Sequence, residues 1–262
     1  VHATIVGKDL LASSLILGNA LVDMYAKCGL LAHAQEVFDN LPVQDVISWN
    51  TLITGYTKHD HNERALRCFQ QMQCKEISPN PVTFICILKV CAKLKAIHIG
   101  MGIHEILREK LLHKECIVGN ALMDMYAKCG FPVKSQEAFV ELPVRDIISW
   151  TTMIAAYTNN KNTEAALQHF EQMRVEGVTP NAFTFVCAFK ACGHDGAIHK
   201  GIQFHAEIFR EGLLERDHIV ANALVDMYAS CGHFPKAWEV FIRLPNKTLL
   251  SWNILIGGYD AQ

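Results

Sequence analysis

Three stretches repeat almost letter for letter along the chain, and they decide its fold. Residues 18–29 read GNALVDMYAKCG, residues 119–130 read GNALMDMYAKCG, and residues 221–232 read ANALVDMYASCG. A second set of strings keeps the same phase: VISWNTLITGYT starts at Val46, IISWTTMIAAYT at Ile147 and LLSWNILIGGYD at Leu249. The chain therefore repeats with a period of about 101 residues, and this self-similarity predicts an array of smaller stacked units.

Equivalent positions divide this long repeat into three kinds of unit. The complete units span 15–45, 46–80, 81–115, 116–146, 147–181, 182–217 and 218–248. Residues 1–14 look like the end of a preceding unit, and residues 249–262 look like the start of another. We therefore expect the chain to be a piece of a longer array, in which case a missing targeting segment carries no information.

Each unit has the pattern of two helices joined by a short turn. In the first unit, apolar residues keep helical spacing up to Gly29, a residue type that favours the backbone conformation found after a helix end. The spacing resumes at Leu31 and stops before Pro42. No segment alternates with period two, so the sequence predicts an all-α fold. Because one helix pair cannot bury its own apolar face, neighbouring pairs must stack into an α-solenoid of helix-turn-helix units.

The tryptophans of the second set of strings lie early in the first helix of their units. They are Trp49, Trp150 and Trp252. We expect them to pack between adjacent helix pairs rather than to stack on a ligand, because a large aromatic side chain contributes most when it is buried.

Composition and motifs exclude several function classes. The 262 residues are 50% hydrophobic, and 24 Lys and Arg against 26 Asp and Glu leave a net charge of −2, so the chain is neither a disordered tail nor a polybasic arm. No apolar run is long enough to cross a bilayer. The ten cysteines include no C-x-x-C pair, which favours buried thiols over a metal site. His205 and Glu207 match only half of the zinc-deaminase signature, and no other catalytic motif is present, so we expect no enzymatic activity, no metal, no cofactor and no small-molecule substrate.

These strings and unit lengths resemble the pentatricopeptide repeat family, in its plant arrangement of P, L and S motifs. By this resemblance the S motifs are 15–45, 116–146 and 218–248, the P motifs are 46–80, 147–181 and the start at 249–262, and the L motifs are 81–115 and 182–217, with 1–14 as the end of another L-type motif. The resemblance implies a right-handed superhelix that binds single-stranded RNA with one base per repeat. It also implies a mitochondrial or chloroplast protein that specifies cytidine-to-uridine editing sites, with accessory editing proteins as further partners and no membrane contact. Any deaminase domain would lie outside this sequence.

The family resemblance implies that the fifth and the last residue of each motif select the base. The fifth residues of the S and P motifs are Asn19, Asn50, Asn120, Thr151, Asn222 and Asn253, all of them polar. In the two L motifs the same position is apolar, as Ile85 and Val186. Amides donate and accept hydrogen bonds at once, so we expect the polar side chains to form an exposed ladder that meets unpaired bases.

The last residue refines the choice of base. A carboxylate suits the N3–H donor of uracil, so Asn19 with Asp45 and Asn120 with Asp146 predict uracil. An amide suits the N3 acceptor of cytosine, so Asn50 with Asn80 predicts cytosine, with uracil tolerated. Thr151 with Asn181 resembles the family's adenine pair, and Asn222 with Thr248 predicts a pyrimidine. The two L motifs are left unassigned, and the predicted target is 5′-U-C/U-n-U-A-n-Y-3′.

Two further columns of residues are candidates for RNA contact. The second residues of the motifs are apolar: Ile16, Ile47, Val82, Ile117, Ile148, Phe183 and Ile219. The resemblance implies that successive members sandwich each base, and the alternative is ordinary packing where the helix begins. The thirteenth residues of the first four motifs are Lys27, Lys58, Lys93 and Lys128, which would contact phosphates or else be ordinary solvated lysines.

A second function stays open on the sequence alone. The L motifs are apolar where bases would be read, so the array would serve as a protein-interaction solenoid that docks accessory factors through them.

Overall fold

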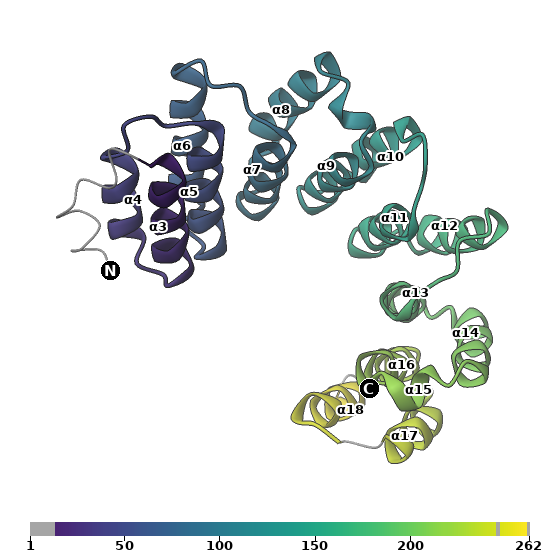
Figure 1. The fold of residues 1–262 in the computed structure, drawn as a ribbon. Coiled ribbons are helices and arrows are strands. Elements are labelled where there is room, and N and C mark those ends of the chain that lie inside the picture. Colours follow the sequence, from purple (N-terminus) through teal and green to yellow (C-terminus); the bar gives the residue numbers. More distant parts are fainter. Residues whose placement is uncertain (1–13, 245–246, 261–262) are drawn as a thin grey trace. The chain divides into compact units, whose positions relative to one another are not determined.

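The computed structural model describes residues 14–244 and 247–260, and every regular element in those ranges is a helix. The helices occur in pairs, as Figure 1 shows, and they divide into two compact units, residues 1–129 and 130–262. The sequence predicted an all-α chain for this part, and the structure confirms it.

The first compact unit holds three complete helix pairs and one further first helix. Its elements are α3 (Leu15–Lys27), α4 (Leu31–Asp39), α5 (Val46–Lys58), α6 (Asn62–Cys74), α7 (Pro81–Leu94), α8 (Ile97–Glu109), the short 3-10 helix η1 (Leu112–Lys114) and α9 (Cys116–Lys128). The first helices of successive pairs pack on one another, α3 on α5, α5 on α7 and α7 on α9. The first helices α3, α5 and α7 also pack on the second helices of their own pairs, α4, α6 and α8, which is the stacking expected of a solenoid.

The second compact unit repeats this arrangement. Its elements are α10 (Pro132–Glu141), α11 (Ile147–Asn159), α12 (Thr163–Val175), α13 (Ala182–Asp195), α14 (Ile198–Arg210), α15 (Leu213–Arg216), α16 (His218–Ser230), α17 (Phe234–Arg243) and α18 (Leu249–Asp260). Here α11 packs on α13, α13 on α16 and α16 on α18.

The first helices begin at the first residue of each expected motif, from Leu15 in α3 to Leu249 in α18. The division into compact units falls inside the expected 116–146 motif, between its two helices. The expected end of an L-type motif, 1–14, lies outside the described residues except for Ser14, whose side chain caps α3.

Helix ends follow the sequence signals. Gly29 and Gly232 have φ values of 77° and 74°, the left-handed conformation that a residue without Cβ adopts freely. The helix α4 ends at Asp39, two residues earlier than its apolar spacing suggests, although Leu41 beyond it is still buried.

Each tryptophan in the core fills the junction between two helix pairs. Trp49 on α5 meets the ring of Phe38 on α4 edge to face, with centroids 4.7 Å apart. Trp150 on α11 meets Phe139 on α10 in the same way at 4.8 Å. Both tryptophans are 1–2% exposed, which confirms that they pack between adjacent pairs. Trp252 contacts Phe241 but stays 42% exposed.

Candidate nucleic-acid interface

The second residues of the motifs form a column of exposed apolar side chains. Every member is more than half exposed, from 52% at Val82 to 83% at Ile16, and the others are Ile47, Ile117, Ile148, Phe183 and Ile219. Packing at the helix start would have buried them, so that alternative is wrong. Because one such side chain is exposed in every complete motif, the column is available to contact a ligand or partner.

The fifth residues lie much deeper than the sequence suggested. Asn50 and Asn120 are 9% exposed, Asn222 is 6% exposed and Thr151 is 5% exposed. The expectation of a freely exposed ladder of polar side chains is therefore wrong for these four residues. Asn50 and Thr151 lie where two successive first helices pack, and each also contacts a hydroxyl of the motif that follows.

In the first compact unit, the fifth residue meets the last residue of its own motif. The Asn50 side-chain nitrogen donates to Asn80 Oδ1 over 2.9 Å. The Asn19 side-chain nitrogen lies 3.5 Å from Oδ1 of Asp45, the last residue of its own motif, which is a weaker contact. Residues that are 26 and 30 positions apart in the sequence thus form pairs, because the last residue of one motif immediately precedes the next first helix.

The other three predicted pairs are arranged differently. Thr151 and Asn181 do not bond directly but share a partner, the hydroxyl of Thr184. Thr248 bonds to Ser251 in the next helix. Asn120 and Asp146 belong to different compact units, so their pairing stays a prediction.

The last residues also have a structural task that the sequence reasoning missed. They are the N-caps of the first helices that follow: Asp45 accepts from the Ser48 N–H and Asp146 from the Ser149 N–H, each over 2.8 Å. Asn80 and Asn181 form capping boxes with Thr83 and Thr184. The signal was available, since an Asp or Asn directly before the first residue of an apolar helical pattern indicates a helix start.

The third residues are a further column that the sequence reasoning missed. The hydroxyl oxygen of Thr83, the third residue of its motif, lies 2.5 Å from Asn50 Oδ1. The hydroxyl oxygen of Thr184, at the same position of its own motif, lies 2.9 Å from Thr151 Oγ1. Both threonines are completely buried. In both complete P motifs, the side chain predicted to read a base therefore contacts the third residue of the motif that follows.

Most of the thirteenth-position lysines are paired with carboxylates. Lys27 lies 2.6 Å from Asp23, Lys128 lies 2.8 Å from Asp124, and Lys93 lies 2.5 Å from Asp60. The hydrogen bond from Lys93 lowers the pKa of the Asp60 carboxyl.

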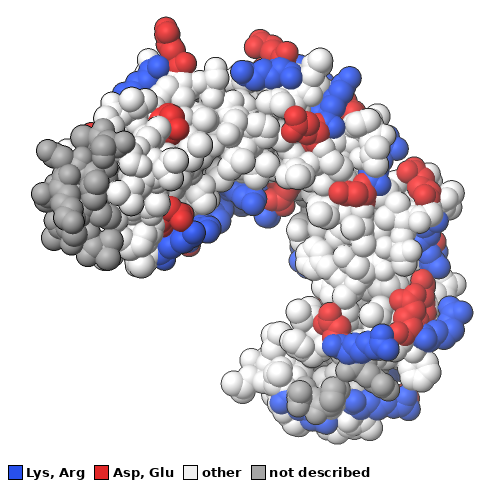
Figure 2. All heavy atoms as spheres, viewed as in Figure 1, with Lys and Arg blue, Asp and Glu red and all other residues white. Residues whose placement is uncertain are grey.

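Lys58 is the exception in this column, because it makes no ion pair with any described residue. Figure 2 shows the same mixture over one face, where basic and acidic side chains lie beside one another and form no continuous basic band. The column therefore offers phosphates less free charge than the lysine count suggests.

Several cysteines and histidines in the described part of the chain are buried or engaged in contacts within the fold. Burial raises the pKa of the Cys68, Cys91 and Cys192 thiols to about 12, so these thiols stay protonated. No group of three or more metal-ligating side chains comes together among the described residues. His205 is occupied by a hydrogen bond of 2.9 Å with the Tyr228 hydroxyl. In the described ranges, no helix is long and apolar enough to span a bilayer.

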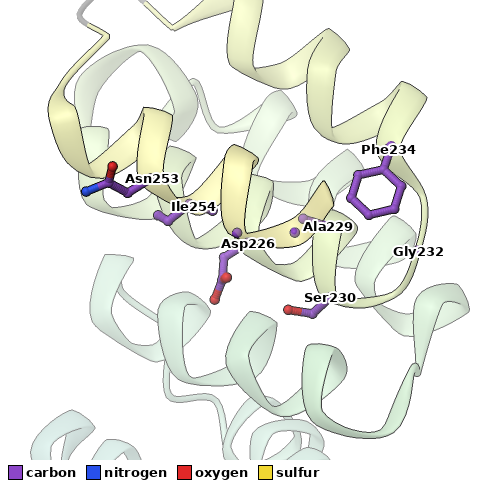
Figure 3. A pocket seen from close by; sticks show the side chains of 9 residues that line it. Asp226, Ala229, Ser230, Gly232, Phe234, Asn253 and Ile254 are labelled. Atoms are coloured by element: carbon purple, nitrogen blue, oxygen red, sulfur yellow. The ribbon is translucent and has the colours of Figure 1, made fainter. Parts of the chain in front are cut away.

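A cavity of about 400 Å³ opens between α16 and α18 in the second compact unit. Asp226 and Ser230 border it from α16, and Asn253, the fifth residue of the last motif, borders it from α18 (Figure 3). Asn253 is exposed, in contrast to Asn50 and Asn222. Phe234 and Ile254 line the same cavity, so both polar and apolar groups border it.

Sequence comparisons place these features in a known family. Residues 44–93 and 145–194 match the PPR repeat family, and residues 19–45, 120–147 and 219–248 match the PPR repeat. A chloroplastic pentatricopeptide repeat-containing protein of Arabidopsis thaliana is 32% identical over 99% of this chain and 42% of its own length. A mitochondrial one from the same plant is 34% identical over 100% of this chain and 25% of its own length. The chain belongs to the pentatricopeptide repeat family, and it spans less than half the length of these relatives.

A solved structure shares the fold. The pentatricopeptide repeat protein PPR10, in complex with an 18-nt psaJ RNA element, superposes with a TM-score of 0.77 at 17% identity, over 93% of this chain and 37% of that one. A further crystal structure of PPR10, from maize, gives a TM-score of 0.65 over 91% of this chain and 36% of that one. The expected α-solenoid of pentatricopeptide repeats is confirmed, and the expected mitochondrial or chloroplast location agrees with the relatives.

Proposed function

We propose that the chain binds single-stranded RNA by its sequence, with one base held by each motif whose fifth residue is polar. The observation that carries the proposal is the pairing of fifth and last residues, best formed where Asn50 donates to Asn80 over 2.9 Å. Such a pair fixes two polar groups at one point, and a base edge placed there meets a defined set of donors and acceptors.

The second residues supply the apolar part of the same site. Ile47 precedes Asn50 by three residues on α5, a spacing that places both side chains on one helix face. Ile47 is 57% exposed while Asn50 is 9% exposed, so a base that covers the isoleucine would reach the amide below it. Excluding water around a hydrogen bond strengthens it, and this supports base-sandwiching by the second column.

Similarity to PPR10 supports RNA as the ligand, because that protein was crystallised with an RNA element. The paired lysines argue for modest affinity. A net charge of −2 gives little long-range attraction to a polyanion, and three of the four thirteenth-position lysines already face a carboxylate.

The test is an anisotropy titration of the 262-residue chain with the RNA 5′-U-C-A-U-A-A-U-3′ and with an RNA that carries the complementary base at each assigned position. We expect each read base to be worth ~1–3 kcal/mol, so the two affinities should differ at least a hundredfold. Equal affinities would end the base assignment. Alanine at Asn19, Asn50, Asn120 and Thr151 together should abolish the preference while the far-ultraviolet circular dichroism stays helical.

The cellular role that we infer is the addressing of cytidine-to-uridine editing sites in an organellar transcript. The P, L and S motif cycle and the chloroplastic and mitochondrial relatives support this role. In it the array selects the site, and a deaminase-like domain elsewhere in the protein or in a partner acts on the cytidine. Editing of a transcript that contains the target, measured in plants that lack the protein, tests it. Unchanged editing at every such site would contradict it.

A second candidate function rests on the L motifs. Ile85 and Val186 replace the polar fifth residue there and remain partly exposed, which suits an accessory protein better than a base. Replacing both by asparagine should weaken capture of accessory editing proteins and leave RNA affinity unchanged if the L motifs dock partners. The opposite pattern would assign them to RNA.

A further inference from the structure

The third residue of each motif matches the fifth residue of the motif before it. Where the earlier fifth residue is polar, the third residue that follows carries a hydroxyl: Ser48, Thr83, Ser149, Thr184 and Ser251. Where the earlier fifth residue is apolar, as in the two L motifs, the third residue that follows is valine, Val118 or Val220. The two columns lie about thirty residues apart, so chain proximity does not account for the match.

The hydrogen bonds of Thr83 show what this hydroxyl does. A hydroxyl has one proton, and its shorter contact is to Asn50 Oδ1 at 2.5 Å rather than to Asn80 Oδ1 at 3.1 Å. Asn80 Oδ1 accepts from the Asn50 amide and from the Thr83 N–H, which fills its two lone pairs. The Asn50 oxygen therefore faces Thr83, and one N–H of its amide is left for a base.

The hydrogen bonds of Thr184 lead to the opposite result for Thr151. The hydroxyl oxygen of Thr184 lies 2.9 Å from Asn181 Oδ1 and 2.9 Å from Thr151 Oγ1, and it accepts from the Asn181 N–H over 3.3 Å. Asn181 Oδ1 can only accept, so both 2.9 Å contacts are hydrogen bonds in one arrangement alone, in which Thr184 donates to Asn181 and Thr151 donates to Thr184. The Thr151 oxygen is left with lone pairs only, which suits the amino group of adenine.

We propose that the third residue of an L motif is a positioning residue that fixes which hydrogen-bonding group the fifth residue of the preceding P motif keeps for its base. Thr83 leaves Asn50 with a free N–H, and Thr184 leaves Thr151 with its lone pairs. The proposal deepens the proposed RNA-binding function and rests on it for the effect on base preference, whereas the orientation of the side chains is independent of RNA.

The S motif at residues 15–45 provides a matched control within the same compact unit. The hydroxyl of Ser48 donates to the Asp45 backbone carbonyl over 2.8 Å and does not bond to Asn19. Asn19 Oδ1 accordingly has no hydrogen-bond partner among the described residues. Asn19 and Asn50 are thus both fifth-position asparagines, but only the Asn50 oxygen is bonded by a hydroxyl of the next motif.

The first experiment compares Thr83→Val, Thr83→Ser and Ser48→Ala in the 262-residue chain by anisotropy, with RNAs that differ only in the base opposite Asn50. Losing one orienting hydrogen bond should reduce the preference for cytosine over adenine about fivefold in Thr83→Val. Thr83→Ser keeps the hydroxyl and should restore the preference, and Ser48→Ala should not change it. A Thr83→Val chain that binds all these RNAs more weakly by one common factor would reduce Thr83 to a structural role and overturn the proposal.

The second experiment needs no RNA. In ¹H–¹⁵N spectra, the Asn50 side-chain amide should shift or broaden in Thr83→Val and stay unchanged in Ser48→Ala, while the Asn19 amide stays unchanged in Thr83→Val. An Asn50 amide that is identical in the wild type and in Thr83→Val would overturn the positioning role. If the wild type shows no base preference but the Asn50 amide responds, the proposed function fails and the orientation of Asn50 by Thr83 stands.

Discussion

The two complete P motifs, residues 46–80 and 147–181, have the same framework and opposite chemistry. Each begins after a capping aspartate whose carboxylate accepts from a serine N–H over 2.8 Å, and each buries a tryptophan against a phenylalanine edge. Yet the fifth residue is Asn50 in one and Thr151 in the other, and the thirteenth is Lys58 in one and Asn159 in the other. The comparison teaches that packing and capping hold the helices, while two or three side chains on that framework set the surface chemistry.

The largest expected effect tests the shared framework. Trp49→Ala and Trp150→Ala should each lower the free energy of unfolding by ~3–5 kcal/mol, because each removes a large, fully buried ring from between two helix pairs. Urea denaturation followed by circular dichroism measures both. Trp252→Ala is the control, with a smaller loss expected because its ring is 42% exposed. A marked difference between Trp49→Ala and Trp150→Ala would show that the two motifs do not share one framework.

The next effect tests the difference in base chemistry. Asn50→Thr gives the first P motif the same fifth and last residues as the second, so its base preference should move from cytosine to adenine. We expect a change of ~1–3 kcal/mol in relative affinity, measured by anisotropy with RNAs that differ at that base. The reciprocal Thr151→Asn should move the other preference from adenine to cytosine. If each motif keeps its original base preference after its fifth residue is exchanged, the base assignment is contradicted.

A smaller effect tests the charge difference. Lys58→Ala should lower the slope of log affinity against log salt concentration by up to ~0.7, the value for one phosphate contact on a single strand. Asn159→Ala at the equivalent position is the matched control and should leave the slope unchanged. Lys27→Ala should have less effect than Lys58→Ala, because Asp23 already pairs with Lys27. An equal loss of slope for both lysines would show that the ion pair opens on RNA binding.

The smallest effect is a pH dependence of the second compact unit. Burial, followed by the nearby Lys236, lowers the pKa of His205 from its ordinary value of 6.5. The folded state therefore binds fewer protons than the unfolded state between the lowered pKa and 6.5, and the free energy of unfolding rises with pH across that window. His205→Gln should flatten this rise in urea titrations between pH 5 and 7. A variant with the same pH slope as the wild type would assign the dependence to other groups.

Much of the fold was predictable because its causes are local. The helix-ending glycines, the apolar spacing and the repeated strings lie within single motifs, and the first helices begin at the first residues of the units that these signals define, from Leu15 to Leu249. The burial of Trp49 and Trp150 was also predictable, because in a solenoid a large apolar ring is buried between adjacent helix pairs.

The candidate site was only partly predictable. The sequence indicated which columns are polar or apolar, and it identified the residue pairs Asn19 with Asp45 and Asn50 with Asn80, which the structure brings into contact. It did not indicate that Asn50, Asn120, Thr151 and Asn222 are nearly buried, nor that Lys93 faces Asp60, because both depend on the neighbouring helix pair.

The amino-acid sequence by itself determined that this protein is an array of helix pairs with a periodic polar column, because hydrophobic periodicity and helix-end signals act within a single motif. The tertiary structure alone decided which hydrogen-bonding group of each polar side chain remains for a ligand. That outcome depends on a hydroxyl contributed by the next motif, 33 positions away for both Asn50 with Thr83 and Thr151 with Thr184. Only the stacking of successive first helices brings such distant residues within hydrogen-bonding distance.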